Sequence, residues 1–451
     1  MTAPAAELPE VPPALRRERR GWYMYDWANA VFHTTVLSVF LGPYLTGIAK
    51  TAAGAGDFVH PLGIPVRAES FYPYVVSLSV ILQVVLLPAV GAVADHSGRK
   101  KLLLAVFAYA GALCTAGLFF CTGGAYLLGG VLFLVANMAF GASITVYYSY
   151  IPDLASADDR DGLSTRGWAT GYIGGGLLLA LNLVLFTLHD SLGVSTGDAV
   201  RICLGSAGVW WALFTIIPLR LLRRDDTSAA AGALTPALRQ SFRQLWATLK
   251  GMRAYPLTLG FLGAYLIYND GVQTVIALAA TYGAQELKLG QTTLISAILM
   301  VQFVAFGGAL GLGRLAARYG AKRVVLGSLV VWAALIGCAY ALQVGKAWQF
   351  YALAAGIAIV LGGTQALSRS LFSHLIPKGK EAEYFGFYQI SDKGTSWLGT
   401  FVFGLTLQFT GSYRSAIITL VAFFVVGFAG LALVNLERAI RAVGNDVPAK
   451  L

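Results

Sequence analysis

The sequence is poor in charged residues: Asp, Glu, Lys and Arg make up only 12% of its 451 positions, whereas soluble domains carry about 25%. Hydrophobic residues make up 57%, and the mean hydropathy is +0.67. This composition excludes an ordinary soluble domain. A bilayer core of about 30 Å requires about 20 apolar residues of helix, and the chain offers such runs repeatedly. Because lipid cannot solvate a bare backbone, we expect these runs to be helices.

The motifs of several enzyme classes are absent. The sequence contains no GxxxxGK[ST] or HExxH, so nothing supports ATP hydrolysis or zinc proteolysis. Cysteine is scarce and lacks the CxxC spacing of metal and redox sites; the four cysteines are Cys114, Cys121, Cys203 and Cys338. We therefore expect no enzyme, cofactor, metal or disulfide.

Twelve apolar runs have the length of a membrane-spanning helix. They occupy residues 22–49, 70–94, 101–123, 126–150, 164–188, 199–221, 257–283, 291–317, 322–343, 347–374, 383–409 and 413–435. The longest polar interruption follows the sixth run. The chain is therefore expected to be an all-α membrane protein, divided into a tail at 1–21, a six-helix half at 22–221, a central loop at 222–256, a second six-helix half at 257–435 and a tail at 436–451.

The positive charges follow this topology. Of the 33 Lys and Arg residues, 25 fall on the side that holds both termini and six on the other side, while Arg369 and Lys393 lie within spans. Cytoplasmic loops are enriched in Lys and Arg, so we expect both termini in the cytoplasm of a multi-pass protein of the cell membrane. The net charge of +11 then reflects topology, and the expected partner is the bilayer rather than nucleic acid.

The two halves contain related segments. Residues 91–101, which read GAVADHSGRKK, recur as GRLAARYGAKR at 313–323, an offset of 222 residues. An Ile-Pro pair follows both the fourth and the tenth span, at 151–152 and 376–377. Such a duplication predicts two pseudo-repeats that rock about a site near the membrane midplane.

The first copy of this segment has the features of a conformational latch. Gly98 permits the positive φ of a tight turn, and Asp95 can accept hydrogen bonds from a neighbouring helix N-terminus or pair with Arg99. Such a contact would hold one of two conformations; the alternative is a basic loop that only sets topology. The segment resembles the loop between the second and third helices of the Major Facilitator Superfamily, a gating loop on the cytoplasmic face. The resemblance rests on Gly91, Asp95, Gly98, Arg99 and Lys100, with His96 where the family usually has a permanent cation.

Six further runs, in order along nearly the whole chain, are similar to the Unknown Major Facilitator family. They are YDWAN at 25–29, IPDLA at 151–155, GYIGG at 171–175, YNDGVQT at 268–274, QALSRS at 365–370 and FGFY at 385–388. That family includes fungal vacuolar amino-acid effluxers linked to autophagy. The resemblance implies a Major Facilitator fold and makes amino acids the leading substrate class.

Polar side chains within the spans are candidates for the solute or proton pathway, because a charge at the bilayer centre costs about 2.5 to 3.5 kcal/mol. Asp26, Asn29 and His33 share one face of the first span, although Asp26 could be interfacial and His33 could simply pack. The other candidates form one patch in each of the seventh, tenth and eleventh spans: Asn269, Asp270 and Gln273; Gln365, Ser368 and Arg369; Gln389, Asp392, Lys393 and Ser396.

Two interpretations of these patches stay open. Arg369 could bind a substrate carboxylate through its forked guanidinium. Alternatively, Asp270, Asp392, Arg369 and Lys393 could pair among themselves as a structural network. The acidic residues of the first and seventh spans, together with His33, can change charge, which favours proton coupling.

Two pairs of glycines have the GxxxG spacing that lets helices pack closely in lipid. They are Gly171 with Gly175, and Gly307 with Gly311. We expect all four to lie against neighbouring helices.

Together these features predict a secondary active transporter that moves a small polar solute by alternating access. Coupling to an ion gradient is expected because no nucleotide site is present, and protons are the first candidate because Asp26, Asp270 and His33 can change charge. A transporter-like receptor or scaffold without flux is the alternative. The expected partners are a small-molecule substrate and the bilayer, and the expected functional unit is a monomer.

Overall fold

The computed structural model describes residues 12–56, 58–223, 250–393, 396–410 and 412–451. The predicted central loop at 222–256 and the predicted tail at 1–21 therefore lie largely outside the described residues. Within them the chain is almost entirely helical, and β1 (Phe58–Val59) pairs with β2 (Val66–Arg67) in a short antiparallel hairpin.

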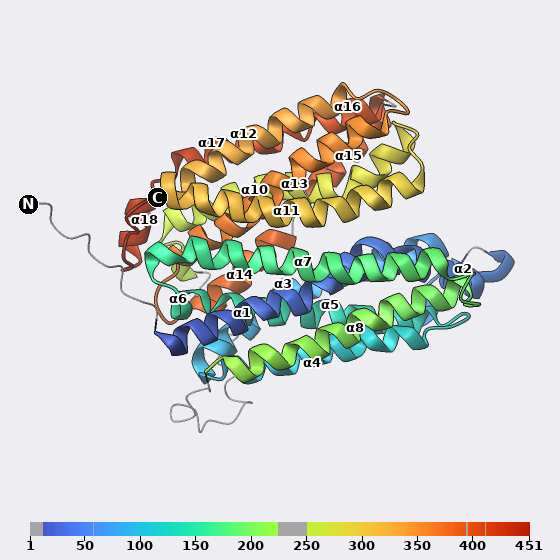
Figure 1. Cartoon of the computed structure of the whole chain (residues 1–451), viewed down its shortest axis with the longest axis horizontal. Helices are drawn as coiled ribbons and strands as arrows, with labels where there is room; N and C mark the ends of the chain where they lie inside the picture. Colours follow the sequence, from blue (N-terminus) through green and yellow to red (C-terminus); the bar gives the residue numbers. More distant parts are fainter. Residues whose placement is uncertain (1–11, 57, 224–249, 394–395, 411) are drawn as a thin grey trace, which may run out of the picture.

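The first half consists of long helices that run back and forth through the molecule (Figure 1). Its first span is continuous, because the π-helix η1 (Phe32–Phe40) joins α1 (Pro13–Val31) to α2 (Leu41–Ala53). The remaining helices of this half are α3 (Ala68–Ser97), α4 (Lys100–Gly117), α5 (Tyr126–Tyr148), α6 (Ile151–Leu154), α7 (Arg160–Leu188) and α8 (Thr196–Leu221), with short 3-10 turns η2 (Gly54–Gly56), η3 (Pro61–Gly63), η4 (Leu118–Phe120) and η5 (Ala157–Asp159).

The second half repeats this pattern, and its last span is made of two consecutive helices. Its helices are α10 (Pro256–Gln285), α11 (Gln291–Tyr319), α12 (Ala321–Tyr340), α13 (Ala347–His374), α14 (Glu381–Lys393), α15 (Ser396–Thr410), α16 (Tyr413–Ile418), α17 (Val421–Leu433) and α18 (Leu436–Ala442). The eleventh predicted span corresponds to α14 and α15, and the twelfth to α16 and α17.

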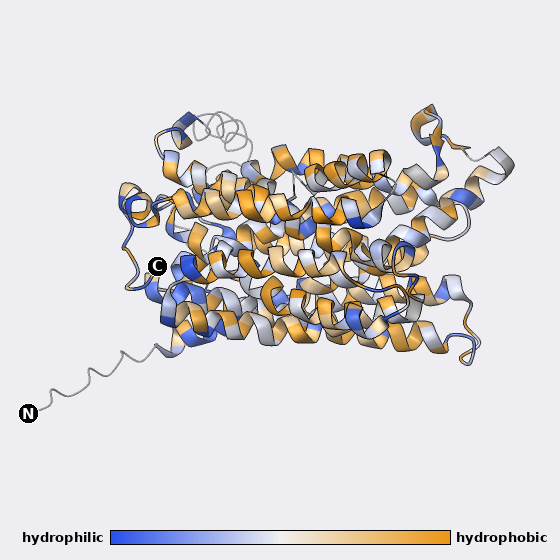
Figure 2. Cartoon of the chain, turned by 90° about the horizontal axis from the view of Figure 1, so that it is seen from above, coloured by the Kyte–Doolittle hydropathy of each residue, from blue (hydrophilic) through white to orange (hydrophobic). Residues whose placement is uncertain are grey.

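The helices have the length and surface of a membrane protein. Ten helical stretches within the described residues are long and apolar enough to cross a membrane. The two other predicted spans, at 257–283 and 383–409, coincide with α10 and with the α14–α15 pair, so the helices agree with twelve spans. Large apolar side chains such as Leu113, Leu213 and Val330 are more than half exposed. Figure 2 shows hydrophilic residues gathering toward the two ends of a mainly hydrophobic bundle, a distribution that suits a lipid environment.

The two ends of the bundle can be told apart by what they carry. The start of α1, α6 and α18 lie at one end (Figure 1), together with the turn between α3 and α4; we call it the loop end. The β1–β2 hairpin lies at the opposite, hairpin end. The turn at the loop end is made by Gly98, whose φ of 61° is left-handed, as predicted.

A lysine from each copy of the repeated segment contacts the end of the last span of its own half. Lys101 Nζ donates to the carbonyl oxygen of Leu222, just after α8, at 2.9 Å. Lys322 Nζ donates to that of Val434, just after α17, at 2.8 Å. The two lysines are one position apart when the copies are aligned at the offset of 222 residues, and each satisfies a carbonyl left free at a helix end.

Residues 443–451 run across the loop end and contact both halves. Asn445 Nδ2 donates to the carbonyl oxygens of His374 and Ile376, at 2.9 and 2.7 Å, in the second half. The backbone N–H of Ala449 donates to Asp158 Oδ1 of the first half at 2.6 Å. This segment therefore bridges the halves after the last span has ended.

Candidate functional site

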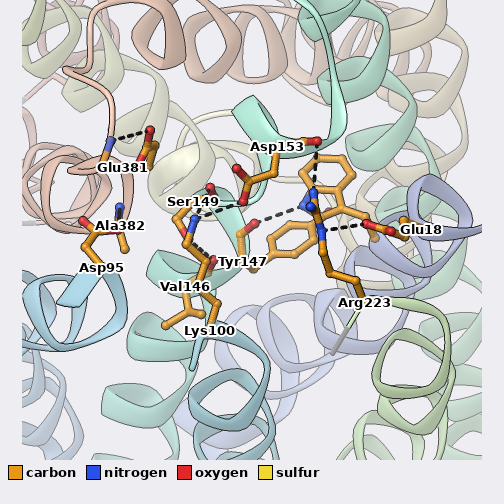
Figure 3. A network of polar contacts seen from close by, with 12 residues as sticks. Glu18, Asp95, Lys100, Val146, Tyr147, Ser149, Asp153, Arg223, Glu381 and Ala382 are labelled. Carbon is orange, nitrogen blue, oxygen red and sulfur yellow. Dashed lines mark hydrogen bonds and ion pairs between the residues drawn. The ribbon is translucent and has the colours of Figure 1, made fainter. Parts of the chain in front are cut away.

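The Gly91–Lys101 loop meets the second half where α3 faces α14, a contact that we call the latch seam. Asp95, which lies beside Ala382 in Figure 3, accepts a hydrogen bond at Oδ1 from the backbone N–H of Ala382 at 3.0 Å. Its Oδ2 accepts one from the backbone N–H of Glu383 at 2.9 Å. The first backbone N–H groups of a helix have no partner within it. Asp95 therefore caps α14 from the other half, which is one of the two partners that the sequence predicts for it.

The latch seam is unusually close because glycines line it from both sides. A Cβ at Gly91 would lie only 2.2 Å from the carbonyl oxygen of Ala382, and a Cβ at Gly386 only 2.7 Å from Pro88 Cα. These obstacles are backbone atoms that cannot rotate away. A side chain at either position would force the halves apart.

Lys100 and Arg99 fix the loop within its own half. Lys100 Nζ donates to the carbonyl oxygen of Ser149 at 3.2 Å and pairs with Asp153 Oδ2 at 3.1 Å (Figure 3). Arg99 immediately precedes α4, and its backbone N–H donates to Ser97 Oγ. The loop is thus held against the end of α5 while Asp95 reaches across the seam.

A second seam, between α7 and the pair α11 and α13, is held by different groups. The position equivalent to Asp95 in the repeated segment is Ala317. Here Arg160 Nη1 donates to the carbonyl oxygen of Ser373 at 2.8 Å, and Ser164 Oγ donates to that of Ala366 at 2.6 Å. Arg160 and Ser164 are not among the predicted site residues, although their i, i+4 spacing at the start of a span is a polar signal.

Asp26 and Arg369 meet at the same end of the molecule, one from each half. Arg369 Nη1 lies 3.7 Å from Asp26 Oδ2, and the Tyr147 hydroxyl donates to the same oxygen at 2.7 Å. Arg369 also donates from Nε to Ser164 Oγ at 2.8 Å and from Nη2 to the Ser164 carbonyl oxygen at 2.7 Å. Gly167 makes room, since a Cβ there would lie 2.6 Å from Asp26 Oδ2. A buried ion pair therefore crosses the boundary between the halves.

The tenth and seventh spans are joined by polar contacts one helical turn from Arg369. Gln365 Nε2 donates to Asn269 Oδ1 at 2.7 Å, and the hydroxyls of Tyr268 and Ser368 are hydrogen-bonded at 2.6 Å. All four side chains are buried. The predicted patches of α10 and α13 thus form one cluster within the second half.

Asp270 is held differently from Arg369. Its Oδ2 accepts a hydrogen bond from the backbone N–H of Gly399 on α15 at 2.6 Å. Within the described residues Asp270 Oδ1 and Thr274 Oγ1 have no hydrogen-bond partner, although both side chains are buried. Gln273 is only half-buried. The structure therefore gives Arg369 and Asp270 separate partners rather than each other.

Of the eleventh-span candidates, only Gln389 can be placed. It is buried on α14, and neither its Oε1 nor its Nε2 has a hydrogen-bond partner among the described residues. Asp392 and Lys393 belong to the backbone of α14, but their side chains lie outside what the structure describes.

Asn29 and His33 continue the face of α1 that carries Asp26, and they differ in exposure. Asn29 is buried and donates from Nδ2 to the Tyr25 carbonyl oxygen at 2.8 Å, one turn back on its own helix. His33, at the start of the π-helix, is exposed. On this face the side chains of Asp26 and Asn29 are therefore buried, whereas that of His33, two turns further toward the hairpin end, is exposed.

The predicted helix packing at the two GxxxG pairs is confirmed for one pair and wrong for the other. Gly171 and Gly175 pack on the first span, with ideal Cβ positions 3.4 Å from Asp26 Cβ of α1 and 2.9 Å from Thr34 Cγ2 of η1, as predicted. The prediction was wrong for Gly307 and Gly311, which have no heavy atom within 4 Å of a Cβ. The close contact is made instead by Gly308, where a Cβ would lie 2.3 Å from the Ile359 carbonyl oxygen. The spacing identifies a glycine-rich helix but not the face that packs.

No group of three or more His, Cys, Asp or Glu side chains arranged to hold a metal ion occurs in the described part of the chain. The polar contacts described above are the Asp26–Arg369 ion pair, the hydrogen bonds of the two seams, and the cluster of amide and hydroxyl groups on α10 and α13.

Comparison with known proteins shows the family. The family described as "Vacuole effluxer Atg22 like" matches residues 14–444. The chain is 30% identical to the uncharacterized MFS-type transporter YxiO of Bacillus subtilis (strain 168), over 96% of this chain and 98% of that protein. It is 25% identical to Autophagy-related protein 22 of Pyricularia oryzae, over 90% of this chain and 74% of that protein.

Solved structures show the same fold at low sequence identity. The proton:xylose symporter XylE superposes with a TM-score of 0.65 at 14% identity, over 92% of this chain and 94% of that one. The predicted Major Facilitator fold and the resemblance to autophagy-linked effluxers are therefore confirmed. The chain belongs to the family described as "Vacuole effluxer Atg22 like", a family of transporters of the Major Facilitator type.

Proposed function

We propose that this transporter moves amino acids by alternating access and couples their movement to protons. The observation that carries the proposal is the buried Asp26–Arg369 pair, which joins the two halves at the loop end. A pair in this position must separate if the loop end opens. The same motion breaks the Asp95 contacts of the latch seam.

The loop end is the cytoplasmic end in this proposal. Most Lys and Arg residues of the predicted loops, 25 against six, fall on the side of the termini, and cytoplasmic loops carry such an excess. The protein then lies in the cell membrane with both termini inside. A single chain contains both halves of the rocking unit, so the functional unit is a monomer.

Amino acids are the proposed substrates for two reasons. The family description and the names of the fungal relatives connect the chain to vacuolar efflux and autophagy. In addition, Arg369 offers a forked guanidinium suited to a carboxylate, and it lies one turn from the amide cluster of Gln365 and Asn269.

The functional test is counterflow in proteoliposomes. Vesicles preloaded with a mixture of unlabelled protein amino acids should take up a labelled trace of the same mixture, and an imposed pH gradient should drive accumulation that a protonophore abolishes. Empty vesicles provide the control. Saturable binding without exchange would reject the carrier and favour a receptor.

Asp270 is the proposed proton carrier, and Asp270→Asn tests it. One carboxylate oxygen is held by the Gly399 N–H and the other has no described partner, so a proton can come and go without breaking a side-chain contact. We expect Asn at this position to abolish accumulation driven by the pH gradient while counterflow exchange persists. Asp190→Asn, at a side chain that is 93% exposed, is the control. Normal proton-driven accumulation in Asp270→Asn would exclude this residue.

Asp95→Ala should slow transport about tenfold or more without loss of expression. Hydrogen bonds to a charged group contribute about 1.5 to 3 kcal/mol each, and the substitution leaves two N–H groups of α14 without their acceptor. Counterflow rates per purified molecule provide the measurement. Asp153→Asn is the matched control, because its pair with Lys100 is partly exposed and contributes only about 0 to 1 kcal/mol. Unchanged turnover in Asp95→Ala would leave the loop with a topological role alone.

A further inference from the structure

The guanidinium of Arg369 is enclosed by side chains that all belong to the other half. Its Cζ lies 4.6 Å from the ring centroid of Tyr148, 5.1 Å from that of Trp22 and 5.7 Å from that of Trp168. These rings come from α5, α1 and α7, and Asp26 of α1 adds the carboxylate. We call Trp22, Asp26, Tyr148 and Trp168 the first-half cage. Arg369 itself is only 1% exposed.

The first-half cage has the composition of a site for an organic cation. Aromatic faces attract guanidinium and alkylammonium groups, most strongly where water is excluded, and Asp26 supplies the counter-charge. The second half contributes only the cation. Within the described residues Arg369 Nη1, the atom nearest Asp26, has no hydrogen-bond partner. The cage is therefore suited to a cation in general and is filled here by a side chain of the protein itself.

Opening of the loop end would leave the cage without its cation. Arg369 moves with α13, whereas the three rings and Asp26 stay with α1, α5 and α7. Removing one partner of a buried ion pair leaves an uncompensated charge, which is strongly unfavourable. A replacement cation would relieve this imbalance, and a solute entering from the loop end can supply one.

We propose that the first-half cage binds the ammonium group of the transported solute when the halves part at the loop end, while Arg369 becomes free to bind the carboxylate. The solute must then carry both groups, as an α-amino acid does. When the loop end closes, Arg369 returns to the cage and displaces the ammonium group toward the hairpin end. This inference rests on the proposed function and specifies which half holds which end of the amino acid.

Chemical complementation of Arg369→Ala tests the cage without any transport measurement. Thermal unfolding of the purified variant in detergent, followed by tryptophan fluorescence, is compared in methylammonium, guanidinium and sodium chloride at equal millimolar ionic strength. We expect methylammonium and guanidinium to raise the unfolding midpoint above its value in sodium. Wild-type protein should show no such difference, because Arg369 already fills the cage.

Two further variants make the result specific. Asp26→Asn combined with Arg369→Ala should lose the response, because the counter-charge is gone. Arg414→Ala removes an arginine that pairs with Glu286 at 2.7 Å, away from the cage, and should give no response to methylammonium. Equal midpoints in methylammonium and sodium, or a response that survives Asp26→Asn, would overturn the proposal.

A second variant, in which Arg369 is expected to leave the first-half cage, tests the proposal if Arg369→Ala cannot be purified. Gly91→Val forces the latch seam apart while Arg369 and the cage stay intact, so methylammonium should raise its unfolding midpoint but not that of the wild type. No response there would also overturn the proposal. Failure of amino-acid counterflow in the wild type would reject the proposed function, yet it would leave these cation measurements interpretable on their own.

Discussion

Gly91→Val is expected to hold the halves apart at the loop end and to reduce transport about 10- to 100-fold. Its Cβ would lie 2.2 Å from the carbonyl oxygen of Ala382 and 2.5 Å from the carbonyl carbon. Overpacking of this kind costs about 1 to 3 kcal/mol, and each 1.4 kcal/mol changes a population ratio about tenfold. Because the halves are separate bundles, the strain is relieved by separating them rather than by unfolding either one.

Accessibility of the loop end measures this shift directly. Ser373 is 1% exposed, and its carbonyl oxygen accepts a hydrogen bond from Arg160 across the second seam. A Ser373→Cys reporter, in a background with the four native cysteines replaced, should react with a soluble maleimide about 10- to 100-fold faster when Gly91→Val is present. The control is Gly311→Val, which meets no heavy atom within 4 Å. Equal labelling rates in the two backgrounds would show that the latch seam does not govern opening.

Arg369→Ala should have the second large effect, a loss of transport of about 100-fold together with a loss of preference for carboxylates. Breaking a buried ion pair by removing one partner costs about 3 to 5 kcal/mol, and here the abandoned partner is Asp26. Arg369→Lys should recover part of the rate, because it restores the charge without the two-pronged geometry.

Competition for counterflow by unlabelled compounds separates the loss of carboxylate preference from the loss of transport rate. In the wild type, an amino acid should inhibit exchange far better than its carboxamide, whereas Arg369→Ala should treat both alike. Arg414→Ala, which removes the pair with Glu286, should keep the wild-type preference. An unchanged preference in Arg369→Ala would remove this residue from the substrate site.

The spans and the turn at Gly98 could be predicted because they depend on local properties. Apolar length determines which segments can cross a bilayer, and only a residue without a Cβ adopts a φ of 61° at no steric cost. For Asp95 the sequence offers two partners, a helix N-terminus and Arg99, and the structure gives it the first of them. None of these inferences required knowledge of the helix that lies opposite.

The partner of Arg369 could not be predicted for the opposite reason. The sequence places Arg369 and Asp270 in the same half and leaves open whether they pair with each other, but Arg369 reaches across to Asp26. Which helices meet is decided by how two complete bundles dock, and no periodicity within one helix records that. Gly308 rather than Gly307 makes the close contact of α11 for the same reason.

The π-helix was also beyond sequence reasoning. Residues 32–40 have an ordinary apolar composition, and α-helix and π-helix differ only in whether each N–H bonds four or five residues back. Small packing differences around Phe32 and Thr34, which lies against Gly175, can decide between them.

Residues 443–451, which bridge both halves through Asn445 and Ala449, bear on how the protein is made. A chain that grows from its amino end places these residues outside the ribosome only after every span has been synthesised. The bridge to Asp158 is thus unavailable while the second bundle is still being inserted into the membrane. During biosynthesis the two bundles can adjust to each other before this last tie across the loop end is completed.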